Sequence, residues 1–261
     1  MSAEMTELLI NVFFVTLLCL PVFLITWLAT RHRNVTNLKT DFSNPRKEAM
    51  LSIAIVVSIS FVLALLIFLL YLNAGGTLGT PSQYTLGNAL FEWGLYGALF
   101  IFPVLAVVKL RHQSFETVGI TRKNAVFSTA LGLVSGLIFT ILIFPFGGTT
   151  GNFSTNNVLY GFVYFLAVGF GEELLFRGYL QLRCTSWLGT SKGLILASVI
   201  MAFYHLPQRI FAVGLDPLQA LVSAVGVLPL SLALGFLMLR TKNTLGPAIM
   251  HTLVDWIPSF L

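Results

Sequence analysis

The chain has 261 residues, of which 56% are hydrophobic and only 10% charged, and its mean hydropathy is +0.88. So few charged side chains cannot cover the surface of a soluble domain of this length, which excludes an ordinary soluble enzyme. The net charge of +5 does not indicate nucleic-acid binding, because the basic residues are scattered in short loops instead of gathered on one face. We therefore expect no nucleic-acid partner.

Long apolar runs follow one another along the whole chain. A helix needs about 20 apolar residues to cross the roughly 30 Å of hydrocarbon in a bilayer. Because backbone polar groups in lipid must be satisfied internally, each run is predicted to be a helix. The runs cover residues 8–29, 49–72, 89–108, 125–146, 158–182, 193–213, 218–239 and 246–260. The sequence therefore predicts an all-α, polytopic transmembrane bundle of about eight helices, surrounded by membrane lipids.

Lysine and arginine gather in alternate loops. The basic loops are 30–48, 109–124, 183–192 and 240–245. The loops 73–88 and 147–157 contain no lysine or arginine. The positive-inside rule then predicts both termini outside a plasma membrane, and we expect the site to open to the cytoplasm.

The loop 109–124 is the longest central polar loop, and it suggests a division into two parts. Residues 1–114 are predicted to form three N-terminal spans. Residues 115–261 are predicted to form a five-span domain that carries the function.

Ionisable side chains inside spans are costly, so each needs a reason. Apart from Glu92, expected at an interface, and Arg209, which with Pro207 breaks its run, six lie inside the predicted spans, all in the second half of the chain: Glu172, Glu173, Arg177, His205, His251 and Asp255. At about 1.5 Å per helical residue from the basic loops, Glu172, His205 and His251 reach depths of roughly 14–20 Å on three different helices. This shared depth predicts one polar site within the last four helices.

Spacing within each helix suggests how these residues divide. Glu173 and Arg177 are four apart with the acid first, the favourable orientation for an ion pair. Glu172 points about 100° away from Glu173 and is left for chemistry. His251 and Asp255 are also four apart and can share a face. Taken singly, Glu173 and Arg177 are more typical of a structural ion pair, and His251 and Asp255 could equally form a contact between helices. It is the shared depth that favours a site.

Other residues near these spans are expected to have structural roles. Glu92, beside Trp93, is predicted to be an interfacial anchor outside the site. Met201, Phe203 and Tyr204 are predicted to pack between helices.

The motifs that carry these residues resemble those of a known family. Residues 172–177 read EELLFR, which resembles the EExxxR motif of the CPBP family, the CAAX-protease and bacteriocin-processing intramembrane proteins, also called the abortive-infection family. This family is similar to the type II CAAX prenyl endopeptidases. The FxxxH motif matches at His205 with Met201 in place of phenylalanine. The HxxxN or HxxxD motif matches from His251 to Asp255.

The resemblance covers about 115–261, and the segment 116–120 resembles the short polar stretch that often precedes this domain. It rests on three motifs in the right order on three membrane helices. It implies that Glu173 and Arg177 hold the shape of the site.

The resemblance also implies an activity, that of an intramembrane endopeptidase, a hydrolase. Glu172 and His205 would activate a water molecule for attack on a peptide carbonyl. His251, with Asp255, would lie on the oxyanion side or position the substrate. Burial disfavours the charged form of a carboxylate and makes it a stronger base, which suits the first of these roles.

Alternatives stay open at this point. Two histidines, two glutamates and an aspartate could bind Zn²⁺, but no HExxH motif is present, and the resemblance implies a metal-free glutamic mechanism without a cofactor. A non-catalytic membrane scaffold or bacteriocin-immunity protein of the same family is a second reading, and a transporter a third. The expected partner is a peptide or membrane-protein substrate, lipidated or not; no oligomeric state is predicted.

Overall fold

The structure is a computed structural model of the chain, and it describes residues 3–33, 42–76, 83–143 and 153–260. Within these ranges every regular element is a helix. The elements are α1 (Ala3–Thr30), α2 (Pro45–Asn73), α3 (Leu86–Tyr96), η1 (Gly97–Ile101), α4 (Phe102–Leu110), η2 (Phe115–Val118), α5 (Ala125–Ile143), α6 (Thr155–Glu173), η3 (Leu174–Gln181), α7 (Leu182–Leu188), α8 (Thr190–Tyr204), η4 (Gln208–Ala212), α9 (Pro217–Gly226), α10 (Leu228–Thr241), α11 (Leu245–Trp256) and η5 (Ile257–Ser259).

Several of these elements continue directly into one another and form single long helices. In the described part of the chain, seven of the resulting helices are long and apolar enough to cross a membrane. The eighth, α11, has 12 residues and follows the last of them. The prediction of an all-α membrane bundle of about eight helices is confirmed.

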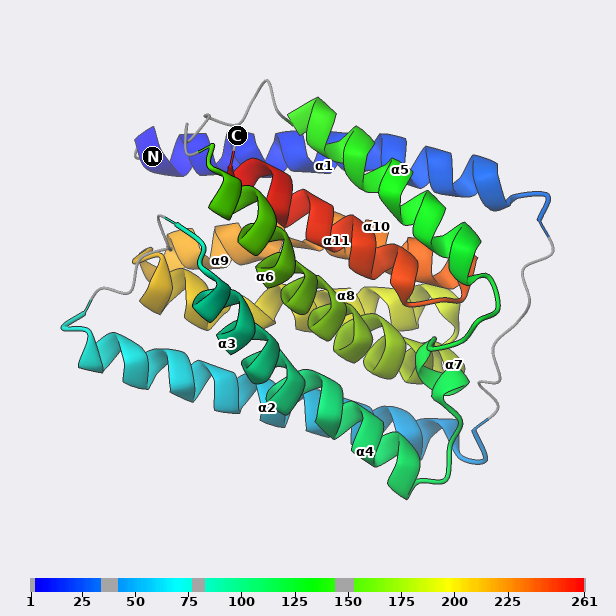
Figure 1. The fold of residues 1–261 in the computed structure, drawn as a ribbon. Helices are drawn as coiled ribbons and strands as arrows, with labels where there is room; N and C mark the ends of the chain where they lie inside the picture. Colours follow the sequence, from blue (N-terminus) through cyan, green and yellow to red (C-terminus); the bar gives the residue numbers. More distant parts are fainter. Residues whose placement is uncertain (1–2, 34–41, 77–82, 144–152, 261) are drawn as a thin grey trace.

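Successive long helices run in opposite directions, so the bundle has two distinct ends (Figure 1). The described terminal residues lie at one end, together with the connection from η4 to α9. The other end carries the chain after α1, the start of α5, the turn between α7 and α8, and the connection from α10 to α11 (Figure 1). The predicted basic loops therefore share one end of the bundle, opposite the termini.

The outer surface of the bundle is apolar. Large side chains such as Phe13, Phe61, Phe102 and Val126 are between 60% and 86% exposed on four different helices. Such exposure is unfavourable in water and is expected for side chains that face lipid.

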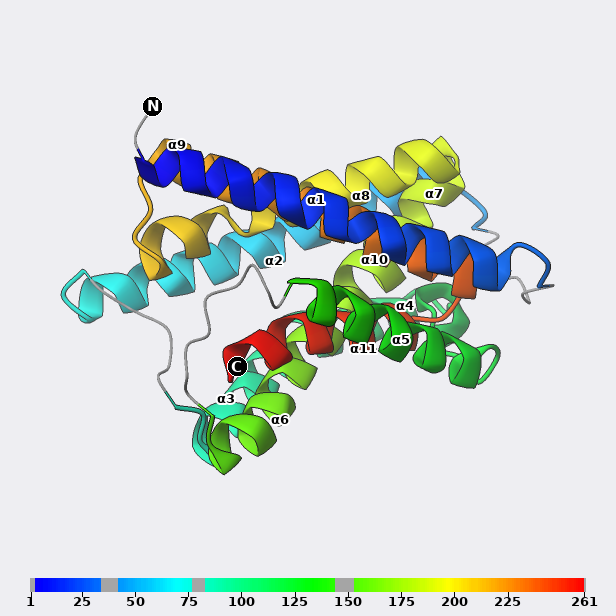
Figure 2. The same ribbon diagram turned by 90° about the horizontal axis from the view of Figure 1, so that it is seen from above.

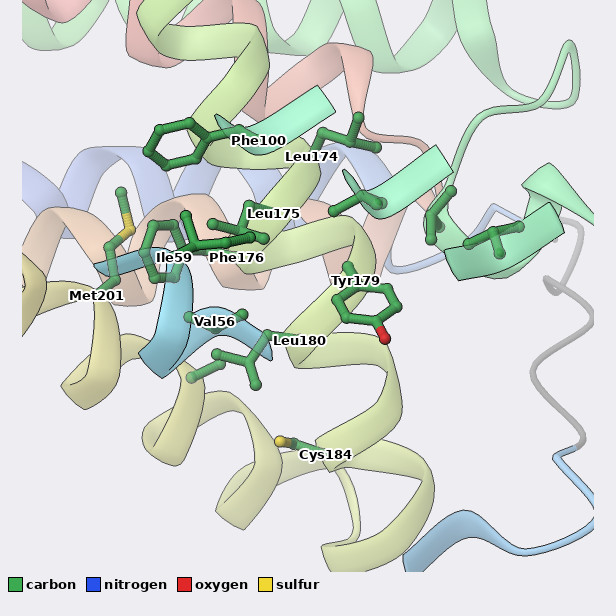
Figure 3. Packing of buried hydrophobic residues seen from close by; sticks show 14 of the residues in the cluster. Val56, Ile59, Phe100, Leu174, Leu175, Phe176, Tyr179, Leu180, Cys184 and Met201 are labelled. Carbon is green, nitrogen blue, oxygen red and sulfur yellow. The ribbon is translucent and has the colours of Figure 1, made fainter. Parts of the chain in front are cut away.

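The interior is built around the continuous helix α6–η3–α7. All eight residues of η3 are buried. Figure 3 shows Leu175, Phe176 and Leu180 of this helix packed with Val56 and Ile59 of α2. Phe100 of η1 and Met201 of α8 complete the same cluster. The helix that carries the two glutamates is thus held on several sides by apolar contacts.

Small residues let α11 lie between α5 and α6. A Cβ atom on Gly169 of α6 would meet Thr252 Oγ1 at 2.5 Å and the Ala248 carbonyl oxygen at 2.8 Å. Gly132 of α5 and Gly246 of α11 approach each other just as closely. Close backbone approach at small residues is the usual way in which membrane helices pack. These contacts fix α11, and with it His251, against α6 (Figure 2).

Candidate active site

Two adjacent glutamates, Glu172 and Glu173, end helix α6, where the chain changes from α-helix to the π-helix η3. Short π-helical segments are rare and frequently occur at functional sites. Both side chains are buried, with 3% and 0% of the residue exposed. Because neighbouring helical residues point about 100° apart, the two carboxylates face different surroundings.

Glu173 connects three other helices. Arg177 Nε donates a hydrogen bond of 3.0 Å to Glu173 Oε2, as the spacing predicted. The Arg177 guanidinium also donates to Ser231 Oγ on α10 at 2.9 Å and contacts Met201 on α8. The other oxygen, Glu173 Oε1, lies 2.9 Å from His251 Nδ1 on α11. This last contact was not expected from the sequence.

His251 lies between two carboxylates. Its Nδ1 faces Glu173, and its Nε2 lies 3.2 Å from Asp255 Oδ2. An imidazole donates to two acceptors at once only when both nitrogens carry a proton. The arrangement therefore holds His251 in a fixed orientation and favours a cationic ring between two anions.

Glu172 faces the other way and is held by two tyrosines. The hydroxyl groups of Tyr96 on α3 and Tyr204 on α8 donate to Glu172 Oε1 at 3.0 Å and 3.3 Å. Glu172 Oε2 has no hydrogen-bond partner among the described residues. One oxygen is thus fixed, and the other is free to accept a proton or a hydrogen bond.

His205 lies next to that free oxygen. Its Nε2 is 4.0 Å from Glu172 Oε2, too far for a direct hydrogen bond. Its Nδ1 is 2.8 Å from the Met201 carbonyl oxygen, which can only accept. Nδ1 must therefore donate, and in the neutral ring Nε2 presents a lone pair towards Glu172.

A cavity of about 560 Å³ adjoins these groups. The catalytic candidates Glu172, His205, His251 and Asp255 all line it. The shared depth of the first three predicted that their side chains lie close together, and in the structure all three line one cavity. Their chemical roles remain predictions.

The cavity occupies one half of the bundle. Its lining includes residues between Leu8 and Val15 of α1, Phe139 and Ile143 of α5, and Pro258 after α11. All of these lie towards the end that carries the termini, and none of its lining residues comes from the turn between α7 and α8 at the opposite end (Figure 1). The cavity therefore extends from the middle of the bundle towards the termini.

Sequence reasoning missed several residues of this site. Tyr204 was expected only to pack, although its position beside His205 could have indicated a role. Tyr96 lies 76 residues before Glu172, and no local pattern connects the two. Glu92, expected to be an interfacial anchor, also lines the cavity, as does Arg209. Trp93 does anchor α3, because its indole donates to the Val163 carbonyl of α6 at 2.9 Å.

Comparison with known families gives one match. Residues 154–257 match the family model described as type II CAAX prenyl endopeptidase Rce1-like. This segment, which is less than half of the chain, is similar to that family. No curated protein and no solved structure gives a significant match to the chain.

The match agrees with the family suggested by the three motifs, and it supports a CAAX-type intramembrane protease at the level of the family. The Rce1-like segment contains all six polar residues singled out in the sequence. Tyr96 and Glu92 lie outside it, so α3 adds to the cavity from the N-terminal part of the chain. The division of the chain at residue 114 remains a prediction.

Proposed function

We propose that this protein is an intramembrane endopeptidase in which Glu172 and His205 activate the hydrolytic water. The observation that supports this most is the separation of 4.0 Å between Glu172 Oε2 and His205 Nε2. A water molecule between two such acceptors can donate one hydrogen to each, with hydrogen bonds of about 2.6–3.2 Å. The two tyrosines on Glu172 Oε1 direct the free oxygen towards this position.

The proposed reaction has two steps. In the first, Glu172 takes one proton from water while the water oxygen bonds to the peptide carbonyl carbon, and the carbonyl electron pair moves to its oxygen. In the second, the oxyanion collapses, the carbon–nitrogen bond breaks, and Glu172 returns the proton to the leaving nitrogen. His205 orients the water through its second hydrogen.

His251 is the group best placed to stabilise the oxyanion. Glu173 fixes the ring through Nδ1, and Nε2 is directed to the cavity side, where Asp255 is its partner. A donor aimed at a developing oxyanion contributes about 3 kcal/mol in such sites. Asp255 would hold the ring in position until the substrate binds.

We propose that this chemistry needs no metal. A zinc ion would require three protein ligands and an open position. His251 could not be one of them as arranged here, since both ring nitrogens face carboxylates. Among the described residues, no group of three or more histidine, cysteine, aspartate or glutamate side chains could hold a metal ion.

We further propose that the termini lie outside the plasma membrane, because the basic loops share the opposite end of the bundle. The cavity extends towards the termini, so a substrate would reach it from the outer side. A cytoplasmic opening, which the sequence suggested, would require cytoplasmic termini.

Maleimide labelling of intact cells that carry Gln83→Cys or His112→Cys, with Cys19 and Cys184 replaced by alanine, tests this orientation. Labelling of His112→Cys alone would show that the basic loops lie outside, and the proposed orientation and side of access would then both be reversed.

The substrate is proposed to be a peptide or a membrane-protein segment, lipidated or not. The proteins of cells that express wild type, Glu172→Gln or Glu116→Gln test the function. Glu116 does not line the active-site cavity, so Glu116→Gln is the control for the same change of a carboxylate to an amide. A peptide product that disappears only with Glu172→Gln is expected. Identical products in all three would favour the non-catalytic scaffold or immunity protein.

A further inference from the structure

Arg209 is a cation in the wall of the active-site cavity. Helix α8 ends at Tyr204, and the chain continues through Pro207 into the π-helix η4. The backbone N–H of Arg209 donates to the His205 carbonyl at 3.0 Å, so the two residues are one helical turn apart and share a side of the chain. Both line the cavity, and Arg209 is the only lysine or arginine among its described lining residues.

The guanidinium of Arg209 is not paired within the described residues. No carboxylate oxygen lies within the 4.0 Å of a salt bridge, and the buried Nε has no hydrogen-bond partner. Arg177 provides the contrast, because Glu173 and Ser231 both accept hydrogen bonds from it. An arginine within a membrane helix is costly, and it normally pairs or marks a binding site.

Negative charges in the cavity attract Arg209 without forming a salt bridge with it. Asp255 and Glu172 are the acidic groups with the strongest electrostatic effect on it. Asp255 is already engaged with His251, and Glu172 with Tyr96 and Tyr204. The N–H groups of Arg209 therefore remain available to a ligand in the cavity.

We propose that Arg209 binds the C-terminal carboxylate of the peptide substrate, and this inference rests on the proposed function. A planar guanidinium donates two parallel hydrogen bonds to a carboxylate, which gives a strong and directional contact. The cavity also contains Glu172, Asp255 and Glu92, which would repel a doubly charged phosphate more than a singly charged carboxylate. Arg209 is thus a specificity-determining residue beside the water-activating pair.

Binding of a matched pair of peptides tests the proposal. The probes are N-acetyl-Leu-Val-Leu with a free carboxylate and the same peptide with a C-terminal carboxamide, titrated calorimetrically into the purified full-length protein. Because the carboxylate accepts charge-assisted hydrogen bonds that the carboxamide cannot match, the acid should bind roughly 10- to 100-fold more tightly than the amide. Arg209→Gln should lower this preference to nearly one while leaving the affinity for the amide unchanged, which also shows that the variant is folded.

Two further variants complete the experiment. Arg209→Lys keeps the charge but not the two parallel donors and should retain part of the preference. Arg240→Gln removes a cation at the opposite end of the bundle and should retain all of it. Equal affinity for acid and amide in the wild type, or a preference that survives Arg209→Gln, would overturn the proposal.

The same measurements separate this inference from the proposed function. Glu172→Gln should bind the acid with the wild-type preference and cleave nothing. If the wild-type protein cleaves no peptide but its preference for the acid depends on Arg209, the carboxylate site stands and the hydrolytic mechanism fails. If the wild-type protein cleaves the acid and the amide equally fast, the hydrolytic mechanism stands and the carboxylate site fails.

Discussion

Glu173 Oε1 lies 2.9 Å from Nδ1 of His251, which comes 78 residues later in the chain. The same carboxylate accepts a hydrogen bond from Arg177 through its other oxygen. The ion pair that holds the shape of the site and the histidine proposed for the oxyanion therefore belong to one network. Changes at Glu173 should affect both stability and catalysis.

Glu173→Gln is expected to destabilise the protein strongly. It leaves Arg177, which is 0% exposed, without a charge partner, and breaking a buried pair in this way costs about 3–5 kcal/mol. Arg177→Ala should cost less than this, because His251 still faces Glu173. Unfolding in mixed detergent micelles measures both.

Glu116→Gln is the matched control for that change. Glu116 pairs with Lys123 at 3.1 Å, but both side chains are partly exposed, and such pairs contribute only about 0–1 kcal/mol. If Glu116→Gln is as destabilising as Glu173→Gln, the network around Glu173 has no special importance for the fold.

The tyrosines on Glu172 should tune the base without holding the fold. Tyr96→Phe and Tyr204→Phe each remove one donor that fixes Glu172 Oε1 and so directs Oε2 to the water. Each should therefore lower kcat about tenfold through poorer positioning of the base, on the scale of one hydrogen bond to a charged group. The rate at which the saturated enzyme forms the product found in the cell comparison gives kcat. Tyr160→Phe, on the same helix as Glu172 but outside the cavity lining, should leave kcat unchanged. Equal turnover in all three variants would remove the tyrosines from the mechanism.

The fold could be predicted from the sequence because the bilayer leaves few choices. Apolar runs of membrane length must be helices, and alternate basic loops gave their directions. The meeting of Glu172, His205 and His251 at one cavity also followed from depth alone. Depth does not say which face of a helix meets which neighbour, however. The contact of His251 with Glu173 depends on how α11 packs on α6, and the role of Tyr96 depends on a helix far away in the sequence.

Gly169 tests how far that packing determines the site. In Gly169→Ala, the added Cβ would meet backbone and side-chain atoms of Ala248 and Thr252 at 2.5–3.0 Å, so α11 must shift and His251 with it. We expect a lower melting temperature and lower kcat. Gly94→Ala is the control, because a Cβ there meets nothing within 4 Å and a helix favours alanine over glycine. Unchanged activity in Gly169→Ala would show that the position of α11 is not critical.

The last prediction separates the glutamate mechanism from a zinc mechanism with the same three residues. A metal held by Glu172, His205 and His251 would need a lone pair from His251, but Glu173 and Asp255 face both of its nitrogens. It would also need another base, whereas Glu172 serves directly if no metal binds. We expect the purified, active protein to contain no stoichiometric metal and to keep its turnover after dialysis against EDTA or 1,10-phenanthroline. A known zinc metalloprotease, treated in parallel, should lose its activity. Turnover that a chelator abolishes and Zn²⁺ alone restores would overturn the glutamate mechanism, while a metal-dependent hydrolase would still fit the Rce1-like segment.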